Sequence, residues 1–197
     1  MRIVKKPEER RQEIVAAAKE LFLEKEYEKT SMQDVMSKLG IAKGTIYHYF
    51  NSKEELLDAV IENLVEEYLA KLQSSLKGLQ GNALDRMHTL IAASKNGESL
   101  EQLHRTGNIG LHARLVALTL TRLAPLYAEV IKQGCEEGLF ATEYPLETAE
   151  FLLAGIQLLT DVGFYPWDKE DLARRKKAIS TLVETQLKAA KGSFNFL

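Results

Sequence analysis

A short run near the start of the chain combines groups that bind phosphate and base edges with groups that build a core. The sequence LGIAKGTIYHYFNSKEEL spans residues 39–56 and places Lys43, Gly44, Tyr47 and His48 within six positions. An ammonium and an imidazole can donate to phosphate, a phenol can donate to phosphate or lie on a thymine methyl, and glycine lets backbones come close. The combination predicts a nucleic-acid contact, provided that one helix presents these groups together.

Helical geometry can separate these groups from the apolar residues between them. With about 100° between successive residues, Ile46, Tyr49 and Phe50 fall on one side of a helix, and Gly44 and His48 fall on the other. The long stem of a lysine at the helix start also reaches outward. We therefore expect the apolar side to pack on neighbouring helices and the polar side to remain available. The expected packing partners are Leu21, Phe22, Val35 and Leu39.

Apolar residues recur with helical spacing along nearly the whole chain, which predicts an all-α protein of about nine helices. Ser31 or Thr30 can cap one helix, Gly40 can end it, and Ser52 with Glu55 can cap another. Pro125 should kink or break the long helix in which it falls, because proline lacks a backbone donor. The expected helices are 8–25, 30–39, 43–50, 53 onward, 83–94, 99–105, 112–138, 145 onward and 168 onward.

The second and third of these helices are joined by a short turn that contains Gly40, which is the arrangement of a helix-turn-helix over about residues 30–50. In that motif the second helix enters the major groove of DNA. Helix starts also carry partial positive charge and attract phosphate. The alternative is an ordinary helical hairpin with exposed polar side chains. The polar residues expected at helix starts are Thr30, Ser31, Ser52 and Lys53.

Composition limits the classes of protein that this chain can be. The 197 residues carry a net charge of −2, with 45 % hydrophobic residues, as in ordinary globular proteins. Up to Lys53 there are eleven basic and eight acidic residues, so the first part carries +3 and the remainder −5. This asymmetry favours a polyanion partner for the first part, although random scatter can also produce it.

No targeting or catalytic pattern stands out. Cys135 is the single cysteine, the start lacks the apolar stretch of a secretory signal, and the most apolar run, residues 151–164, is too short and polar to span a membrane. The histidines lack metal-binding spacing such as HExxH, and Cys135 has no evident base partner. We therefore expect a soluble cytoplasmic protein that is not an enzyme and has no cofactor, no metal and no membrane partner.

The stretch TSMQDVMSKLGIAKGTIYHYFNSKEEL resembles the DNA-binding module of the TetR family of bacterial transcription regulators, over about residues 8–56. A weaker resemblance covers EEGLFATEYPLETAEFLLAGIQLLTD. The resemblance implies a three-helix head at 1–52 and a helical body at 53–197 that dimerises and binds an effector. Ala42 departs from the family, which usually has Ser or Thr there, and alanine cannot cap the helix. The implied DNA contacts are Thr30, Ser31, Lys43, Gly44, Thr45, Tyr47, His48 and Lys53.

The end of the chain predicts a subunit interface. Residues 151–162 are apolar almost all round, so this helix needs partners on more than one side. A second subunit can supply one of them, and a simple monomeric core is the alternative. The resemblance places the last two helices of each subunit in a four-helix interface. The expected interface residues are Phe151, Gln157, Leu158, Ile179, Leu182 and Val183.

An effector pocket is implied by the resemblance alone, and the dearth of clustered charge favours an apolar or aromatic effector. Each candidate also has an ordinary explanation as a surface or core residue. The pocket candidates are His88, His104, Asn108, His112, Tyr127, Gln157 and Asp161.

The sequence and this resemblance together predict a homodimeric transcription regulator, a repressor rather than an activator, that binds a palindromic operator and is released by a small molecule. The alternatives are a helical DNA-binding protein without small-molecule control and a helical protein-interaction module.

Overall fold

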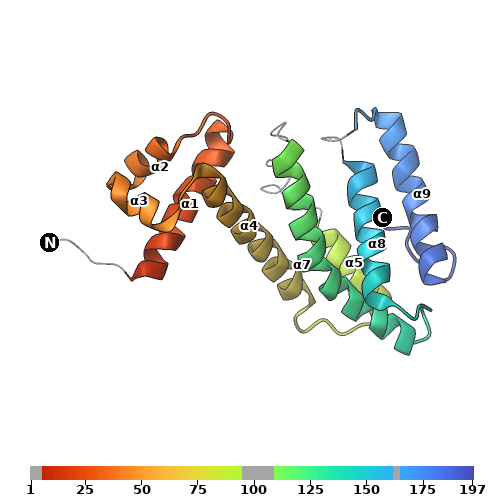
Figure 1. Cartoon of the computed structure of the whole chain (residues 1–197). Helices are drawn as coiled ribbons and strands as arrows, with labels where there is room; N and C mark the ends of the chain where they lie inside the picture. The colour runs from red at the N-terminus through yellow and green to blue at the C-terminus, as the bar shows by residue number, and fades with distance from the viewer. Residues whose placement is uncertain (1–5, 95–108, 162–164) are drawn as a thin grey trace. The chain divides into compact units, whose positions relative to one another are not determined.

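A computed structural model describes residues 6–94, 109–161 and 165–197, and every regular element in these ranges is a helix (Figure 1). The all-α prediction is confirmed, with eight helices where about nine were expected. The helix predicted at 99–105 lies outside the described residues. The helices are α1 (Pro7–Lys25), α2 (Met32–Leu39), α3 (Lys43–Tyr49), α4 (Lys53–Leu76), α5 (Ala83–Ser94), α7 (Ile109–Glu136), α8 (Pro145–Thr160) and α9 (Lys169–Leu187).

The described chain divides by packing within α4, between Glu66 and Glu67, into two compact units. We call residues 6–66 the head and the described residues from Glu67 onward the body. The boundary predicted from the sequence, between residues 52 and 53, coincides with the start of α4 rather than with this division. That domain boundary stays a prediction.

The head is built on the apolar stripe of α1, which packs against α2, while α2 packs against α3. Phe22 meets Tyr27 edge to face, with 5.2 Å between ring centroids, where the chain turns after α1. An ion pair of 2.7 Å between Lys38 and Glu20 joins α2 to α1 at the surface. The buried apolar side chains of the first three helices and of the turns beside them are Ile14, Val15, Ala17, Ala18, Leu21, Phe22, Tyr27, Val35, Met36, Ile46 and Phe50.

Local capping sets the ends of the head helices. The Ser31 hydroxyl accepts the Asp34 amide at 3.2 Å and the Asp34 carboxylate accepts the Ser31 amide at 2.8 Å, so Ser31 begins α2 with a capping box. Gly40 ends α2 at φ 60°, a left-handed conformation that glycine adopts without strain. At the start of α4 the Ser52 hydroxyl accepts the Glu55 amide at 3.1 Å, as predicted.

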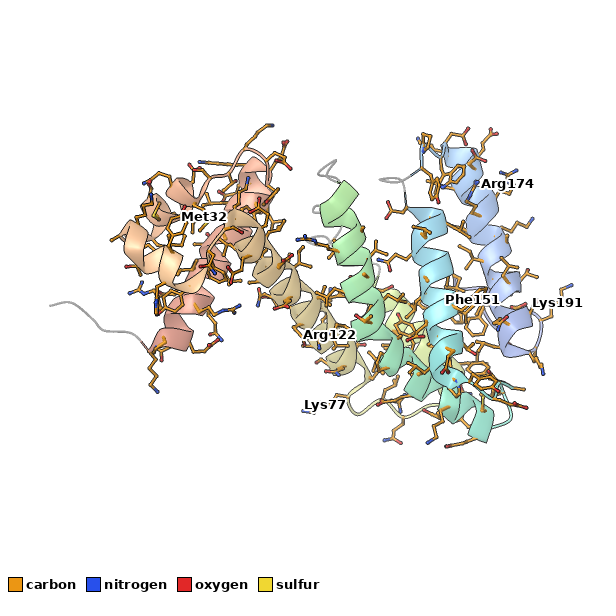
Figure 2. The ribbon with its side chains drawn as sticks, viewed as in Figure 1. Met32, Lys77, Arg122, Phe151, Arg174 and Lys191 are labelled. Atoms are coloured by element: carbon orange, nitrogen blue, oxygen red, sulfur yellow. The ribbon has the colours of Figure 1, made fainter. Side chains whose placement is uncertain are left out.

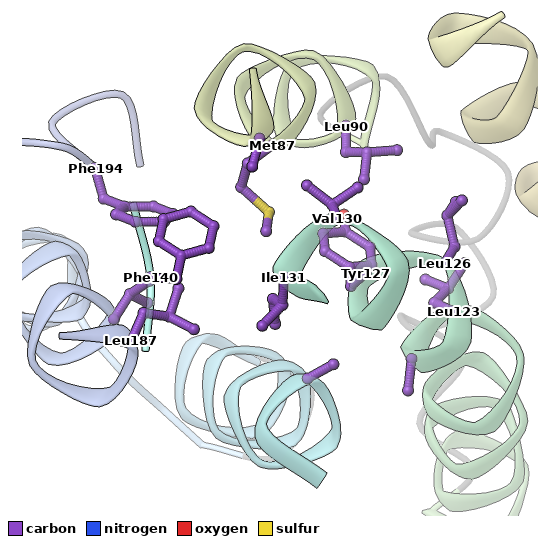
Figure 3. Close-up of a cluster of buried hydrophobic side chains, with 14 of the residues drawn as sticks. Met87, Leu90, Leu123, Leu126, Tyr127, Val130, Ile131, Phe140, Leu187 and Phe194 are labelled. Carbon is purple, nitrogen blue, oxygen red and sulfur yellow. The ribbon is translucent and has the colours of Figure 1, made fainter. Parts of the chain in front are cut away.

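The body surrounds one apolar core supplied by α4, α5, α7, α8 and α9 (Figure 3). Helix α7 packs along α8, and α5 and α9 pack against α7 and α8 respectively. A kink or a break was predicted at Pro125, and the break does not occur, because α7 continues through the proline as one helix of 28 residues. Pro125 is exposed, while Ala124 and Leu126 beside it are buried, so core packing on both sides offsets the lost hydrogen bond.

Hydrogen bonds between residues far apart in the sequence join the helices and the tail of the body. The Glu137 carboxylate accepts the Ala83 amide at 2.8 Å, which links the end of α7 to the start of α5. The buried Glu184 carboxylate accepts the amides of Gly192 and Phe194 at 2.8 and 3.1 Å, which folds the tail after α9 back onto the body. Phe194 then lies in the core, 5.9 Å from the Phe140 ring (Figure 3).

Within the described ranges, none of the helices combines the length and apolar character needed to cross a lipid bilayer.

Candidate nucleic-acid interface

Helix α3 divides its side chains as the sequence predicts. Ile46 and Phe50 are 0 % and 1 % exposed, whereas Tyr47 is 41 % exposed. Lys43, Gly44 and His48 are exposed beside it. Tyr49, expected in the core, is only half-buried, and its ring meets the His48 ring edge to face at 5.0 Å. The apolar side of this seven-residue helix is thus anchored, and its polar side is free of covering protein in the head.

Two side chains on the exposed side of α3, those of Lys43 and Tyr47, contact each other. The Lys43 ammonium lies 5.6 Å from the centre of the Tyr47 ring, within reach of a cation–π attraction. This contact favours a side-chain position in which ammonium and phenol face the same region. A methyl group placed on Gly44 would meet nothing within 4 Å, so the backbone here is open to an approaching molecule. The surface offers hydrogen-bond donors and a cation, which suits an anionic partner.

The polar groups at the start of α2 are less available to a phosphate than their position implies. The Ser31 hydroxyl donates to the Asp34 carboxylate at 2.5 Å, and that bond, with the Ser31 amide, lowers the pKa of Asp34. Asp34 therefore remains a carboxylate that interacts favourably with the helix start. Lys25 approaches it at 3.6 Å and offsets part of the charge that a phosphate would meet. Ser31 is exposed, but its hydroxyl already has a partner.

Thr30 is the clear exception among the predicted DNA contacts. It is only 2 % exposed, and its hydroxyl donates to the carbonyls of Glu26 and Leu21 at 2.9 and 3.3 Å. Glu26 leaves α1 at φ 69°, an unusual conformation for a residue with a side chain. Thr30 stabilises that turn from inside, so its hydroxyl cannot reach a DNA backbone in this arrangement.

Thr45 and Lys53 are half-buried. The Lys53 ammonium lies 3.9 Å from the centre of the Tyr27 ring, which ties the start of α4 to the turn after α1. Sequence reasoning missed Arg11, whose guanidinium lies 5.1 Å from the centre of the Phe50 ring, at the end of α3. No spacing rule could find this pair, because the two residues are 39 positions apart in the sequence. Ala42 stands at the start of α3 and makes no side-chain cap, as expected.

Of the six predicted interface residues, three are exposed, two are buried and Gln157 is half-buried. Phe151 is 68 % exposed on α8 (Figure 2), and Leu158 and Leu182 are exposed as well. Ile179 and Val183 are instead buried in the body core, so the prediction that they face a partner subunit is corrected. They share one stripe of α9 with Leu187, and that stripe faces the chain's own core, whereas Leu182 points away from it.

The four pocket candidates whose side chains the structure describes do not share one environment. Tyr127 lies in the body core. His88 is exposed, with its ring 4.8 Å from the Phe196 ring, so its side chain lies at the surface rather than in the body core. Gln157 and Asp161 are half-buried on α8 and at its end. His104, Asn108 and the side chain of His112 lie outside the described residues.

Comparison with known proteins agrees with this division into head and body. Residues 14–60 match the family model of bacterial regulatory proteins of the tetR family. Residues 91–182 match the model of a tetracyclin repressor-like C-terminal domain. The chain belongs to the TetR family. The head of this TetR-family protein carries the helix-turn-helix of a DNA-binding transcription regulator.

Individual relatives are distant but cover most of the chain. The uncharacterized HTH-type transcriptional regulator YfiR of Bacillus subtilis is 24 % identical over 95 % of this chain and 97 % of its own length. The HTH-type transcriptional repressor KstR2 of Mycobacterium tuberculosis is 26 % identical over 70 % of this chain and 72 % of its own. A TetR-family regulator from Pectobacterium atrosepticum shares the fold, with a TM-score of 0.69 at 21 % identity, over 93 % of this chain and 98 % of that one.

Among the residues described, no group of three or more histidine, cysteine, aspartate or glutamate side chains is placed to hold a metal ion.

Proposed function

We propose that this TetR-family regulator is a homodimeric repressor that binds a palindromic operator through α3 and leaves it when a small molecule binds the body. The observation that carries the proposal is the divided surface of α3, with Ile46 and Phe50 buried and Lys43, Tyr47 and His48 exposed. The name of KstR2 as a transcriptional repressor supports the sign of regulation. In this proposal the chain acts by binding rather than by catalysis, in the cytoplasm where bacterial DNA lies.

On DNA, the exposed side of α3 would lie in the major groove. Lys43 would pair with a phosphate or with guanine acceptors, Tyr47 would donate to a phosphate or cover a thymine methyl, and Gly44 would let the backbone approach. His48 would donate to a phosphate. A two-fold dimer would place two copies of α3 about 34–36 Å apart, in successive major grooves, which is why we expect a palindromic operator.

The proposed subunit interface is the exposed apolar stripe of α8. Phe151, Gly155, Leu158 and Leu159 recur at the spacing of one helix face, and Leu182 adds an exposed leucine on α9. A methyl group on Gly155 would meet nothing within 4 Å, so this stripe has room for a closely packed helix. Exposed apolar stripes of this kind favour association with a second copy of the chain.

Release requires that the effector bind the DNA-competent and released arrangements with different affinity. Helix α4 belongs to both units, since it runs from Lys53 into the body. A small change in how the body holds α4 would change the spacing of the two α3 helices in the dimer. The effector would then act on operator affinity without contacting DNA.

The decisive experiment measures operator binding by fluorescence anisotropy, on a site selected from random DNA by the full-length protein. Lys43→Ala and Tyr47→Ala should each weaken binding at least about tenfold, the loss of one contact to a charged group. Lys43→Ala should also reduce the slope of log K against log salt by about one. Lys132→Ala removes the same charge from an exposed position of α7 and should change neither quantity.

The alternatives give different results. Binding that does not depend on salt, or that both α3 variants leave unchanged, would favour a protein-interaction module. A dimer that Phe151→Glu fails to weaken in sedimentation would place the subunit interface elsewhere.

A further inference from the structure

Two polar residues interrupt the buried stripe of α7. Along this helix the side chains that are at most 8 % exposed recur at helical spacing, and all but two of them are aliphatic. Thr119 and Tyr127 are the exceptions, and each is 8 % exposed. The members of the stripe are Leu115, Thr119, Leu123, Ala124, Leu126, Tyr127, Val130 and Ile131. Polar groups on such a stripe normally have hydrogen-bond partners within the protein.

The Thr119 hydroxyl has no such partner. Four other helical threonines of this chain donate to the carbonyl four residues earlier, at 2.7 to 3.0 Å. Thr121, two residues along the same helix, is one of the four. Thr119 could make the same bond to Leu115 but instead directs its hydroxyl elsewhere. The threonines that bond back to the helix are Thr89, Thr121, Thr160 and Thr185.

The tyrosine hydroxyls nearby are also poorly paired. No part of the chain that the structure describes makes a hydrogen bond with the Tyr127 hydroxyl. Tyr68, packed against the same core from α4, reaches the Ser94 carbonyl at 3.5 Å, which is long for a hydroxyl donor. Burial raises the pKa of Tyr68 and of Tyr127, so both hydroxyls keep their protons and remain donors.

Charged groups are scarce in this interior. Glu184 is the one side chain among the buried residues described that carries a charge at neutral pH, and its carboxylate already accepts two amides of the tail. Arg86 of α5 is half-buried, and its charge is accompanied by that of Glu137. Burying a charged ligand beside neutral hydroxyls alone would be costly, because a buried charge needs an opposite charge or many hydrogen bonds.

We propose that the hydroxyls of Thr119 and Tyr127 bind the effector, and that the effector is an uncharged, mainly apolar molecule with a carbonyl-type oxygen that accepts their hydrogen bonds. This inference rests on the proposed effector control and adds the chemical class of the effector. Figure 3 shows Tyr127 on α7 close to Val130, and both residues belong to the body core, so the ligand would lie among side chains of that core.

The geometry of α7 sets the distance that a ligand must span to contact both hydroxyls. Thr119 and Tyr127 are eight residues apart, or roughly 12 Å along the helix axis. Helical side chains lean toward the N-terminus, so the Tyr127 hydroxyl approaches the level of Leu123. A ligand in contact with both hydroxyls would therefore cover Leu123 with apolar atoms.

The test uses isosteric variants that remove one hydroxyl each. Thr119→Val and Tyr127→Phe take away the proposed donors, and Thr121→Val is the matched control, because Thr121 is exposed on the same helix. In ligand-free protein, the first two variants should leave the urea midpoint unchanged or raise it, since no intramolecular hydrogen bond is lost. A clear fall in the midpoint would show that the hydroxyls have protein partners and would overturn the proposal.

Two series of matched compounds then probe the ligand class. They are 2-nonanone, nonanoate and nonylamine, and acetophenone, benzoate and benzylamine. A ketone should raise the melting temperature and release operator at lower concentration than the acid or amine of its series. Thr119→Val and Tyr127→Phe should raise the ketone concentration needed about tenfold, the loss of about 1.4 kcal/mol, and Thr121→Val should not.

The outcomes separate this inference from the proposed function. Release by an acid or amine in preference to the ketones, no response to either ketone, or an unchanged ketone response in both variants would overturn the ligand class. Operator binding with its salt dependence would survive each of those results. Loss of salt-dependent operator binding would instead overturn the proposed function.

Discussion

The head and the body of this protein differ in how far apart in the sequence their hydrogen-bonded side chains lie. In the head, Ser31 pairs with Asp34 and Ser52 with Glu55, each three positions apart. In the body, Glu137 pairs with Ala83 and Gln133 with Gly81, 54 and 52 positions apart. The helix ends of the head are therefore set largely by neighbouring residues, whereas these hydrogen bonds of the body exist only after the chain has folded.

This difference predicts how each region responds to small changes. A substitution in the head should alter one helix end or one surface group, so stability and DNA binding can be varied separately. A substitution at a tertiary contact of the body should disturb several helices together.

Gly134→Ala should have the largest effect. The added methyl group would lie 2.1 Å from Cδ2 of the buried Phe140 ring, so the ring or the helix must move. Overpacking of this kind costs about 1–3 kcal/mol and sometimes more. Urea unfolding should show a loss at the upper end of that range or above it. Stability that stays unchanged would mean that the end of α7 packs less tightly than the structure indicates.

Glu184→Ala should have the next largest effect. It leaves the amides of Gly192 and Phe194 without their acceptor and frees the tail that carries the buried Phe194. Hydrogen bonds to charged groups are worth about 1.5–3 kcal/mol, and we expect a loss of that size in urea unfolding. Gln186→Ala is the control at a neighbouring exposed position and should cost little. Equal stability of the two variants would contradict the role of Glu184.

Gly44→Ala sharpens the contrast with Gly134→Ala, because the same change is made in the head. The new methyl group meets nothing within 4 Å, and alanine favours helix over glycine by up to about 1 kcal/mol. Stability should therefore stay the same or rise. Operator affinity, measured by anisotropy, should fall about tenfold, because the methyl group holds the backbone away from DNA. Full operator affinity in this variant would remove Gly44 from the proposed interface.

Ala42→Ser should have the smallest effect, and it should be favourable. Ala42 has the extended backbone of a helix cap, at φ −74° and ψ 154°, but offers no acceptor to the first amides of α3. A serine there should add about 1 kcal/mol to the stability of the protein. If the hydroxyl also reaches a phosphate, operator affinity will rise together with stability. A loss of stability would mean that α3 begins differently from the structure.

The sequence predicted the head well because its signals are local. Ser31, Gly40 and Ser52 mark helix ends, and Ile46 and Phe50 mark a buried face, all within one or two turns of the chain. Thr30 was misread for the same reason. Its position at a helix start was visible, but the turn through Glu26 that draws its hydroxyl inward depends on the end of α1.

The body was predicted only in outline. The apolar pattern of α9 identified Ile179, Leu182 and Val183 as apolar, but not which of them would face the chain's own core. Nothing in the sequence indicated that His88 is exposed and lies beside Phe196. Periodicity identifies a helix face as apolar, and the neighbour that covers this face is decided by packing.

The sequence by itself determined the helices of the head, their ends and the chemistry of the α3 surface, because capping and helical periodicity act between residues a few positions apart. Only the tertiary structure decided that Thr30 is buried, that Ile179 and Val183 belong to the core, and that Thr119 directs an unpaired hydroxyl into the interior. Each of those outcomes depends on which distant side chains exclude water from a position, and this is settled when the helices pack.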